Sequence, residues 1–224
     1  IELTKKYFSN INVDLMYALK QETLEELTED VKNLLKLNVP HISTYSLMIE
    51  PHTVLYNKKE EPILEELDSK MYQTICSTLE ACGYQHYEVS NFALPGFESK
   101  HNLVYWNNEH YYGYGLGASG YLNQKRYTNT RSIQSYLKGE YKKEEVNLTK
   151  EEQMQEEVFL GLRKLKGIDT NAFFYKYGVS IYDMFEIQNL IEKGKLEREK
   201  EWIRIPKEQI YLSNEVLVYF VGEV

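Results

Sequence analysis

The chain is poor in cysteine and proline, with two and five residues among 224. Cys76 and Cys82 stand six positions apart in a helical pattern, so their side chains face different directions. This spacing fits neither a disulfide framework nor the ligand set of a metal site. We interpret both residues as ordinary thiols of the core or the surface.

Long apolar runs and an excess of positive charge are also missing. No run of about 18 apolar residues occurs, and the start, IELTKKYFSN, lacks a basic-then-apolar leader, so we expect no membrane span and a cytoplasmic protein. The net charge of −8 argues against non-specific attraction to nucleic acid or anionic lipid through the whole-protein field, although a local basic patch is compatible with it. Because the chain opens at Ile1 and soon enters a strand pattern, we expect the C-terminal piece of a larger protein.

The first part of the chain has the pattern of a βαβ unit. Residues 11–17 predict a strand, residues 23–38 a helix, and residues 41–49 a second strand. Such a unit requires a parallel sheet with a right-handed crossover. A long helix at 63–81 and a third strand at 84–89 are expected to follow.

Two acidic side chains fall at the ends of these strands. Asp14 lies on a strand that reads as mostly buried, where a carboxylate is costly unless it meets a donor or a ligand. Glu50 closes the second strand. Together they would suit a polar small molecule with an amine or ribose hydroxyls, whereas a cap for the following helix is the structural alternative for Asp14.

The most unusual stretch is YEVSNFALPGFESKHNLVYWNNEHYYGYGLGASGY, residues 87–121, which mixes aromatics with glycines. His101 and Asn102 are followed by Tyr105 and Trp106, so one face would carry an imidazole and an aromatic shelf. That combination can ligate a porphyrin iron and stack on the macrocycle. A hydrogen-bonded packing histidine is the alternative.

Four glycines at the end of this stretch, Gly113, Gly115, Gly117 and Gly120, resemble a phosphate-binding fingerprint. Their spacing does not match G-x-G-x-x-G between a strand and a helix, and no G-K-[ST] completes a P-loop. We therefore interpret them as sites of close backbone approach or of a bulged strand.

The last third of the chain is expected to be mainly helical. Polar capping residues indicate three helix starts, at Thr149, Asp169 and Ser180. Residues 196–199 and 202–205 can pair as a hairpin, residues 207–221 return to a mixed helical pattern, and helices before a hairpin suggest a winged-helix-like arrangement. Because residues 149–224 hold 11 basic and 14 acidic side chains, a packing or interaction module is favoured over nucleic-acid binding.

Three pieces of the sequence match one family in order and spacing. They are DLMY at 14–17, HISTYSLMIEPHT at 41–53, and YEVSNFALPGFESKHNLVYW at 87–106, supported by FLGLRKLKGID at 159–169 and LIEKGKLE at 190–197. The chain resembles the C-terminal portion of a radical S-adenosylmethionine protein of the oxygen-independent coproporphyrinogen III oxidase family. The element H-N-x-x-Y-W is typical of its heme chaperone branch.

The resemblance implies a fold and a set of contacts. The fold is α/β, with the last strands of a partial (β/α) TIM-like barrel in residues 1–90, an aromatic and glycine-rich connection in 91–145, and a mainly helical winged-helix-like domain in 146–224. Heme would contact the four residues of the H-N-x-x-Y-W element, with His101 as candidate iron ligand. Positions that line the S-adenosylmethionine pocket are matched by Asp14, Met16 and Met48.

The chain also departs from the family pattern. The cluster motif C-x-x-x-C-x-x-C is absent, so the [4Fe-4S] cluster and S-adenosylmethionine chemistry would belong to the full-length parent, and the chain alone is predicted to be inactive. The usual G-L-P-G-Q-T is replaced by residues 18–23, ALKQET. Ser119 stands where a histidine is usual.

Two functions remain from this reasoning. The first is a heme-binding, heme-trafficking protein whose partners are heme and a heme-receiving respiratory protein, with no nucleic acid. The alternative is an oxygen-independent oxidase that converts coproporphyrinogen III to protoporphyrinogen IX by oxidative decarboxylation. Missing barrel strands would leave an unpaired edge near residues 11–17, which predicts self-association, for instance as a homodimer, or marginal stability.

Overall fold

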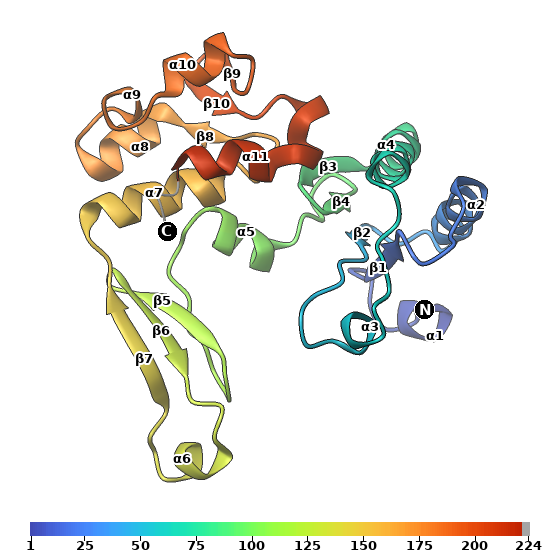
Figure 1. Cartoon of the computed structure of the whole chain (residues 1–224), viewed down its shortest axis with the longest axis horizontal. Helices are drawn as coiled ribbons and strands as arrows, with labels where there is room; N and C mark the ends of the chain where they lie inside the picture. Colours follow the sequence, from blue (N-terminus) through green and yellow to red (C-terminus); the bar gives the residue numbers. More distant parts are fainter. Residues whose placement is uncertain (221–224) are drawn as a thin grey trace. The chain divides into compact units, whose positions relative to one another are not determined.

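A computed structural model describes residues 1–220 and is a mixed α/β structure (Figure 1). It forms two compact units, Ile1–Ser99 and Lys100–Val224. The expected division into three parts is not tested by this observation and stays a prediction. Along residues 1–220, no helix combines the length and the apolar character needed to cross a membrane.

The first unit contains a four-stranded sheet in the order β1-β2-β4-β3. Its strands are β1 (Asn12–Tyr17), β2 (His41–Ser46), β3 (Gln85–Glu88) and β4 (Asn91–Ala93). Its helices are α1 (Glu2–Lys5), α2 (Leu24–Leu35), α3 (Val54–Asn57) and α4 (Glu65–Ala81). The β1 and β2 strands pair in parallel, as the βαβ pattern predicts, whereas β4 runs antiparallel to both β2 and β3.

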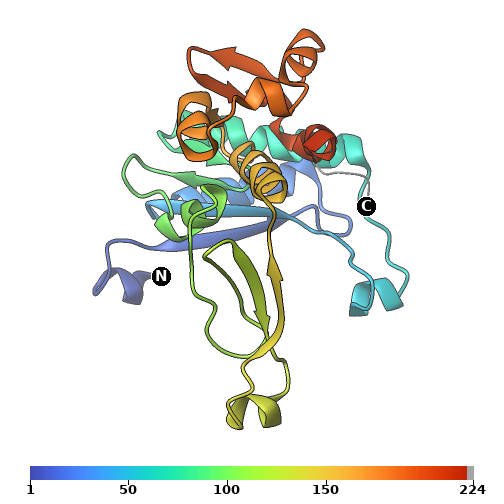
Figure 2. The ribbon, with the colours of Figure 1, turned by 90° about the vertical axis from the view of Figure 1, so that its left-hand side faces the viewer.

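Local sequence explains the βαβ part. Thr23 caps α2, and Thr23 and Glu26 exchange the two hydrogen bonds of a capping box. The apolar residues of α2 and α4 are spaced for one helix face, and Leu27, Val31 and Ile75 are fully buried. Figures 1 and 2 show both helices on the same side of the sheet, so its other side carries the polar groups described below.

The structure corrects two boundaries in this unit. The second strand ends at Ser46, three residues before the predicted Ile49, so Met48 and Glu50 follow the strand rather than close it. The short strand β4 was not predicted, because three residues are too few to show a period.

The second unit begins with α5 (Lys100–Trp106) and a three-stranded antiparallel sheet. The sheet consists of β5 (Ser119–Leu122), β6 (Lys125–Asn129) and β7 (Lys142–Asn147), with α6 (Ile133–Leu137) between the last two strands. Figure 2 shows this sheet and α6 as an arm extending from α7. Of these elements, the sequence pattern predicts only α6, as a short helix over residues 132–137.

Close backbone approach, as expected, explains Gly113, and the close approach of a tyrosine ring explains Gly120. A Cβ on Gly113 would lie 2.2 Å from the carbonyl oxygen of Ser119, and one on Gly120 would lie 2.2 Å from the ring of Tyr127. Gly113 therefore excludes any side chain, whereas a side chain at position 120 would require the ring of Tyr127 to move.

The remainder of the second unit packs helices on a small antiparallel sheet of order β8-β10-β9. The elements are α7 (Lys150–Gly161), β8 (Ile168–Asp169), α8 (Thr170–Tyr177), α9 (Ile181–Met184), α10 (Ile187–Glu192), β9 (Glu197–Glu199), β10 (Trp202–Arg204), η1 (Lys207–Leu212), α11 (Ser213–Leu217) and η2 (Val218–Phe220). The predicted caps at Thr149, Asp169 and Ser180 and the hairpin are confirmed.

Two details of this part differ from expectation. The helix that starts after Ser180 breaks at Phe185, whose backbone is extended, and so forms α9 and α10. The strand β8 was missed because it has only two residues. The last residue of the helical pattern predicted to Val221 lies outside the described residues.

Candidate functional site

The H-N-x-x-Y-W element forms the single short helix α5, which places two of its four side chains together. His101 and Tyr105 are four residues apart and share a helix face. The Tyr105 hydroxyl lies 3.1 Å from Nε2 of His101, and the two rings meet edge to face at 4.9 Å between centroids. His101 is exposed and Tyr105 half-buried, so the imidazole is open to a ligand from solvent.

Trp106 does not join this face. It is five residues from His101, and the guanidinium of Arg163 lies 5.7 Å from the centroid of its ring. The indole Nε1 is buried and has no hydrogen-bond partner among the described residues. The expected single aromatic shelf is therefore divided: Tyr105 stays beside the imidazole, and Trp106 packs toward α7. Asn102 is half-buried next to His101.

Behind Tyr105 lies a polar network centred on Arg126 of β6. The ring of Tyr105 meets that of Tyr111 at 4.6 Å, and Arg126 donates to the Tyr111 hydroxyl at 3.1 Å. The same guanidinium donates to both carboxylate oxygens of Glu156 at 2.7 to 3.0 Å and to Oδ1 of Asn108 at 3.1 Å. This network connects α5, β6 and α7 and holds the aromatic pair in place.

The electrostatics of this network favour charged Arg126. Burial alone would lower the pKa of Arg126, but its hydrogen bond and ion pair with Glu156 outweigh that cost and raise the pKa. Burial also raises the pKa of Tyr111, against the opposing effect of Arg126, so this phenol is neutral and serves as a hydrogen-bond acceptor.

A pocket of about 760 Å³ shares Asn108 with this network. It is lined by amides, two tyrosines, two lysines and a histidine: Asn108, His110, Tyr121, Asn123, Gln124, Leu148, Lys150, Gln153, Lys176 and Tyr177. Arg126 stacks on the ring of Tyr121 at 4.4 Å, and Lys176 pairs with Glu157 at 2.6 Å. That ion pair compensates the charge of Lys176, so Lys150 is the lining residue that gives the pocket its positive charge.

The first unit holds the residues expected near S-adenosylmethionine. Asp14 and Met16 alternate on one exposed face of β1, and Met48 is 74% exposed after β2. The expectation of a buried Asp14 is wrong: its carboxylate is exposed and accepts a hydrogen bond from the Asn12 side chain at 2.7 Å. The strand was expected to be mostly buried, but alternate residues of β1, including Asp14, face away from the helices.

A second polar group on this sheet was missed by the sequence analysis. His41 is only 4% exposed; its Nδ1 donates to Oδ1 of Asn12 at 2.6 Å, and its Nε2 accepts from the Tyr87 hydroxyl at 2.8 Å. That hydroxyl accepts in turn from the Ser99 amide at 3.1 Å. Burial raises the pKa of Tyr87 to about 12. The alternating polar positions of β1 and β2 were the sequence signal that could have revealed the polar group around His41.

His41 gives a test of this arrangement. Burial lowers the pKa of His41 below its usual 6.5, although Asp14 and Glu98 act in the opposite direction. The unfolded state therefore binds more protons just below pH 6.5, and stability falls as the pH drops through that range, by no more than about 1.4 kcal/mol per pH unit. We expect this part of the pH dependence of the melting temperature to disappear in His41→Gln, whereas the exposed His52→Gln keeps it. An unchanged profile in His41→Gln would contradict the assignment.

The cysteines do not form a metal site. Cys76 is half-buried on α4 and Cys82 is exposed at its end. Within residues 1–220, no group of three or more His, Cys, Asp or Glu side chains is arranged to hold a metal ion. The residues present therefore do not fit an iron–sulfur cluster.

Sequence comparison places these features in a known group. A family model for the HemN C-terminal domain matches residues 148–212. Heme chaperone HemW of Lactococcus lactis is 42% identical over 98% of this chain and 60% of its own length. Heme chaperone HemW of Bacillus subtilis is 40% identical over 97% of this chain and 60% of its own length. The chain is similar over almost its whole length to proteins named heme chaperone HemW.

The fold comparison agrees. Coproporphyrinogen III oxidase (HemN) from Escherichia coli, a radical SAM enzyme, superposes with a TM-score of 0.79 over 99% of this chain and 57% of that protein, at 16% identity. At that identity the match shows a shared fold alone. The chain spans 60% of the length of the two HemW proteins, so it corresponds to a part of them.

Proposed function

We propose that this chain is the heme-binding part of a heme-trafficking protein. The observation that carries the proposal is the exposed imidazole of His101, fixed beside Tyr105 on α5 in a chain similar to proteins named heme chaperones. An oxidase is not proposed, because the relatives that match this chain at 40 to 42% identity carry the chaperone name and the oxidase shares the fold alone.

The side chains of α5 suit transient heme binding. A neutral histidine nitrogen is a common axial ligand of heme iron, and tyrosine edges pack well on a macrocycle. Nε2 of His101 lies within hydrogen-bond distance of the Tyr105 hydroxyl, so ligation through Nε2 requires this contact to open. A ligand that must compete with a neighbouring hydroxyl favours release as well as capture, which a carrier needs.

The proposal extends to two cofactors of the longer parent, S-adenosylmethionine and a [4Fe-4S] cluster. Asp14, Met16 and Met48 offer a carboxylate for ribose hydroxyls and exposed thioethers near the ends of two parallel strands, which fits S-adenosylmethionine. The [4Fe-4S] cluster would have its ligands outside this chain. In this proposal, the β1 and β2 strands are the last strands of a partial TIM-like barrel, and residues 146–224 form a winged-helix-like domain.

Partners and location extend the proposal. A heme-receiving respiratory protein would take the cargo, with the carrier in the cytoplasm. β1 pairs only with β2 among the described residues, so its other edge is open to a missing barrel strand or to a second copy in a homodimer.

Hemin titration tests the heme site. We expect a saturable Soret shift with this chain, and a dissociation constant about tenfold or more higher in His101→Ala because an axial ligand is lost. His110→Ala is the matched control, since His110 is an exposed histidine of the same unit outside α5. Equal affinities in the chain and both variants, or no shift at all, would refute heme binding at His101.

A further inference from the structure

The arm of the second unit carries exposed apolar side chains at its end. We define the tip as residues 131–143, which include α6. Ile133 and Leu137 lie four residues apart on one face of α6 and are 60% and 80% exposed, and Tyr141 is 54% exposed. Exposing apolar side chains to water is unfavourable, so a cluster of this kind indicates a surface that another molecule covers.

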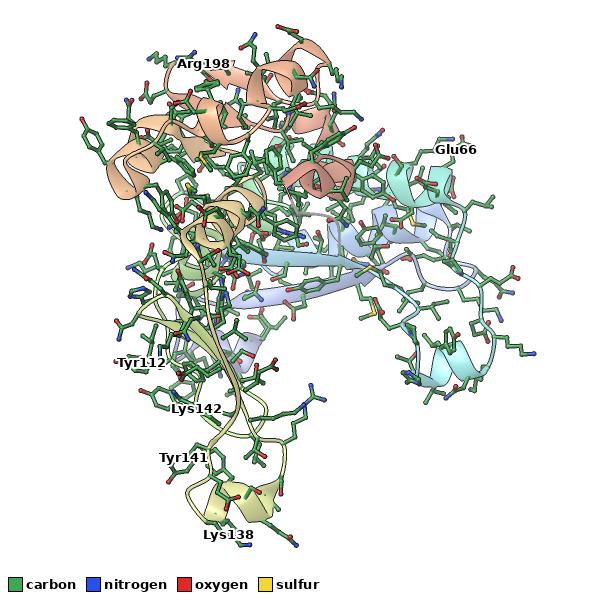
Figure 3. All side chains as sticks on the ribbon, turned by 60° about the vertical axis from the view of Figure 1, so that its left-hand side comes forward. Glu66, Tyr112, Lys138, Tyr141, Lys142 and Arg198 are labelled. Atoms are coloured by element: carbon green, nitrogen blue, oxygen red, sulfur yellow. The ribbon has the colours of Figure 1, made fainter. Side chains whose placement is uncertain are left out.

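The tip is basic although the chain is acidic. Its charged residues are Arg131, Lys138, Glu140, Lys142 and Lys143, a net charge of +3 against −8 for the chain. The exposed Glu144 and Glu145 follow directly on β7, so the net charge over residues 131–145 is +1. Lys142 pairs with Glu145. Arg131, Lys138 and Lys143 have no ion pair within the described residues. Figure 3 shows Lys138, Tyr141 and Lys142 along the end of the arm.

The tip is held in shape rather than loosely attached. The Tyr136 hydroxyl accepts from the Gly115 amide at 3.2 Å, and its ring meets that of Tyr141 edge to face at 4.9 Å. The amide of Thr130 donates to the carbonyl of Tyr141 at 2.7 Å, which closes the base of the loop. These contacts turn Tyr136 inward and leave the apolar side chains of α6 exposed.

We propose that this tip docks on the surface of an anionic lipid bilayer. Aliphatic side chains at the end of a projection can enter the acyl boundary, while the surrounding lysines and arginine meet lipid headgroups. A protein partner would need a patch of about 800 Å² per side, more than a single turn of helix offers. Nucleic acid is disfavoured because Ile133 and Leu137 are aliphatic, and of the three exposed apolar side chains of the tip only Tyr141 offers a ring on which a base could stack. The site differs from His101, and the proposal does not depend on heme binding.

Vesicle flotation tests the proposal. We expect the chain to float with vesicles of phosphatidylglycerol and phosphatidylcholine, and to float less with pure phosphatidylcholine or at raised salt. Leu137→Ser should weaken binding about tenfold by removing the inserted side chain. Lys138→Glu should weaken binding by more than about fivefold, because it both removes and reverses a charge.

The controls distinguish binding through the tip from non-specific hydrophobic binding. Leu64→Ser removes an equally exposed leucine, 79% against 80%, from the first unit and should bind like the parent chain. Circular dichroism of every variant checks that the fold is kept. Absence of binding to anionic vesicles, or equal losses in Leu64→Ser and Leu137→Ser, would overturn the proposal; in the first case a protein partner would be the occupant of the tip.

Discussion

Gly167→Ala is expected to destabilise the second unit by at least about 4 kcal/mol, because it combines a backbone clash with an unfavourable conformation. Gly167 has φ +77°, in the left-handed region that favours glycine. A Cβ there would lie 2.0 Å from the carbonyl oxygen of Ile203 and 2.6 Å from Cβ of Arg204. Both neighbours belong to β10, the central strand of its sheet, so the backbone cannot yield without breaking strand pairing.

Gly178→Ala separates the clash from the conformation. Gly178 has φ +72°, but a Cβ there would meet no atom within 4 Å. This variant should therefore lose only about 1 to 2 kcal/mol, the cost of left-handed backbone in a residue with a Cβ. Urea unfolding followed by circular dichroism measures both. Similar losses for the two variants would mean that the β10 contact is not what constrains Gly167.

Local sequence rules predicted the parts of the fold that depend on neighbours along the chain. The cap at Thr149 and the aspartate cap at Asp169 each involve residues at most three positions apart, and both were predicted. The βαβ unit was also found because its apolar periods are regular. The β5–β7 sheet was missed, since its pairing joins residues up to about twenty positions apart and its strands mix tyrosine, glycine and charge.

The same limit applies to the candidate site. The motif predicts that His101 and Tyr105 share a face, and the structure agrees, although the helix α5 that brings them together was not predicted. The position of Trp106 depends on Arg163 of a later segment, and the support of Tyr105 depends on Arg126 and its partner thirty residues further on. Motif resemblance identifies which residues to examine, but nonlocal ion pairs decide which of them stay together.

Arg126→Ala is the second substitution with a large expected effect. It should lower the free energy of unfolding by about 3 kcal/mol, because it leaves Glu156, the Tyr111 hydroxyl and Oδ1 of Asn108 without their donor in a part-buried network. The side chain of Arg126 is 29% exposed, which makes this loss smaller than for a fully buried pair. Thermal and urea unfolding measure it.

Lys125→Ala is the matched control for Arg126. Lys125 precedes it on β6 and pairs with Glu145 at 3.0 Å, but its side chain is 44% exposed. Its removal should cost less than about 1 kcal/mol, as exposed pairs do. Arg126→Lys keeps the charge but cannot reach both oxygens of Glu156 together with Tyr111, so it should fall between the two. If Arg126→Ala and Lys125→Ala lose similar stability, the network does not hold Tyr111 against Tyr105. Hemin affinity should then be equal in both variants.

If instead Arg126→Ala also weakens hemin binding at temperatures where it remains folded, the network positions the side chains of the heme site.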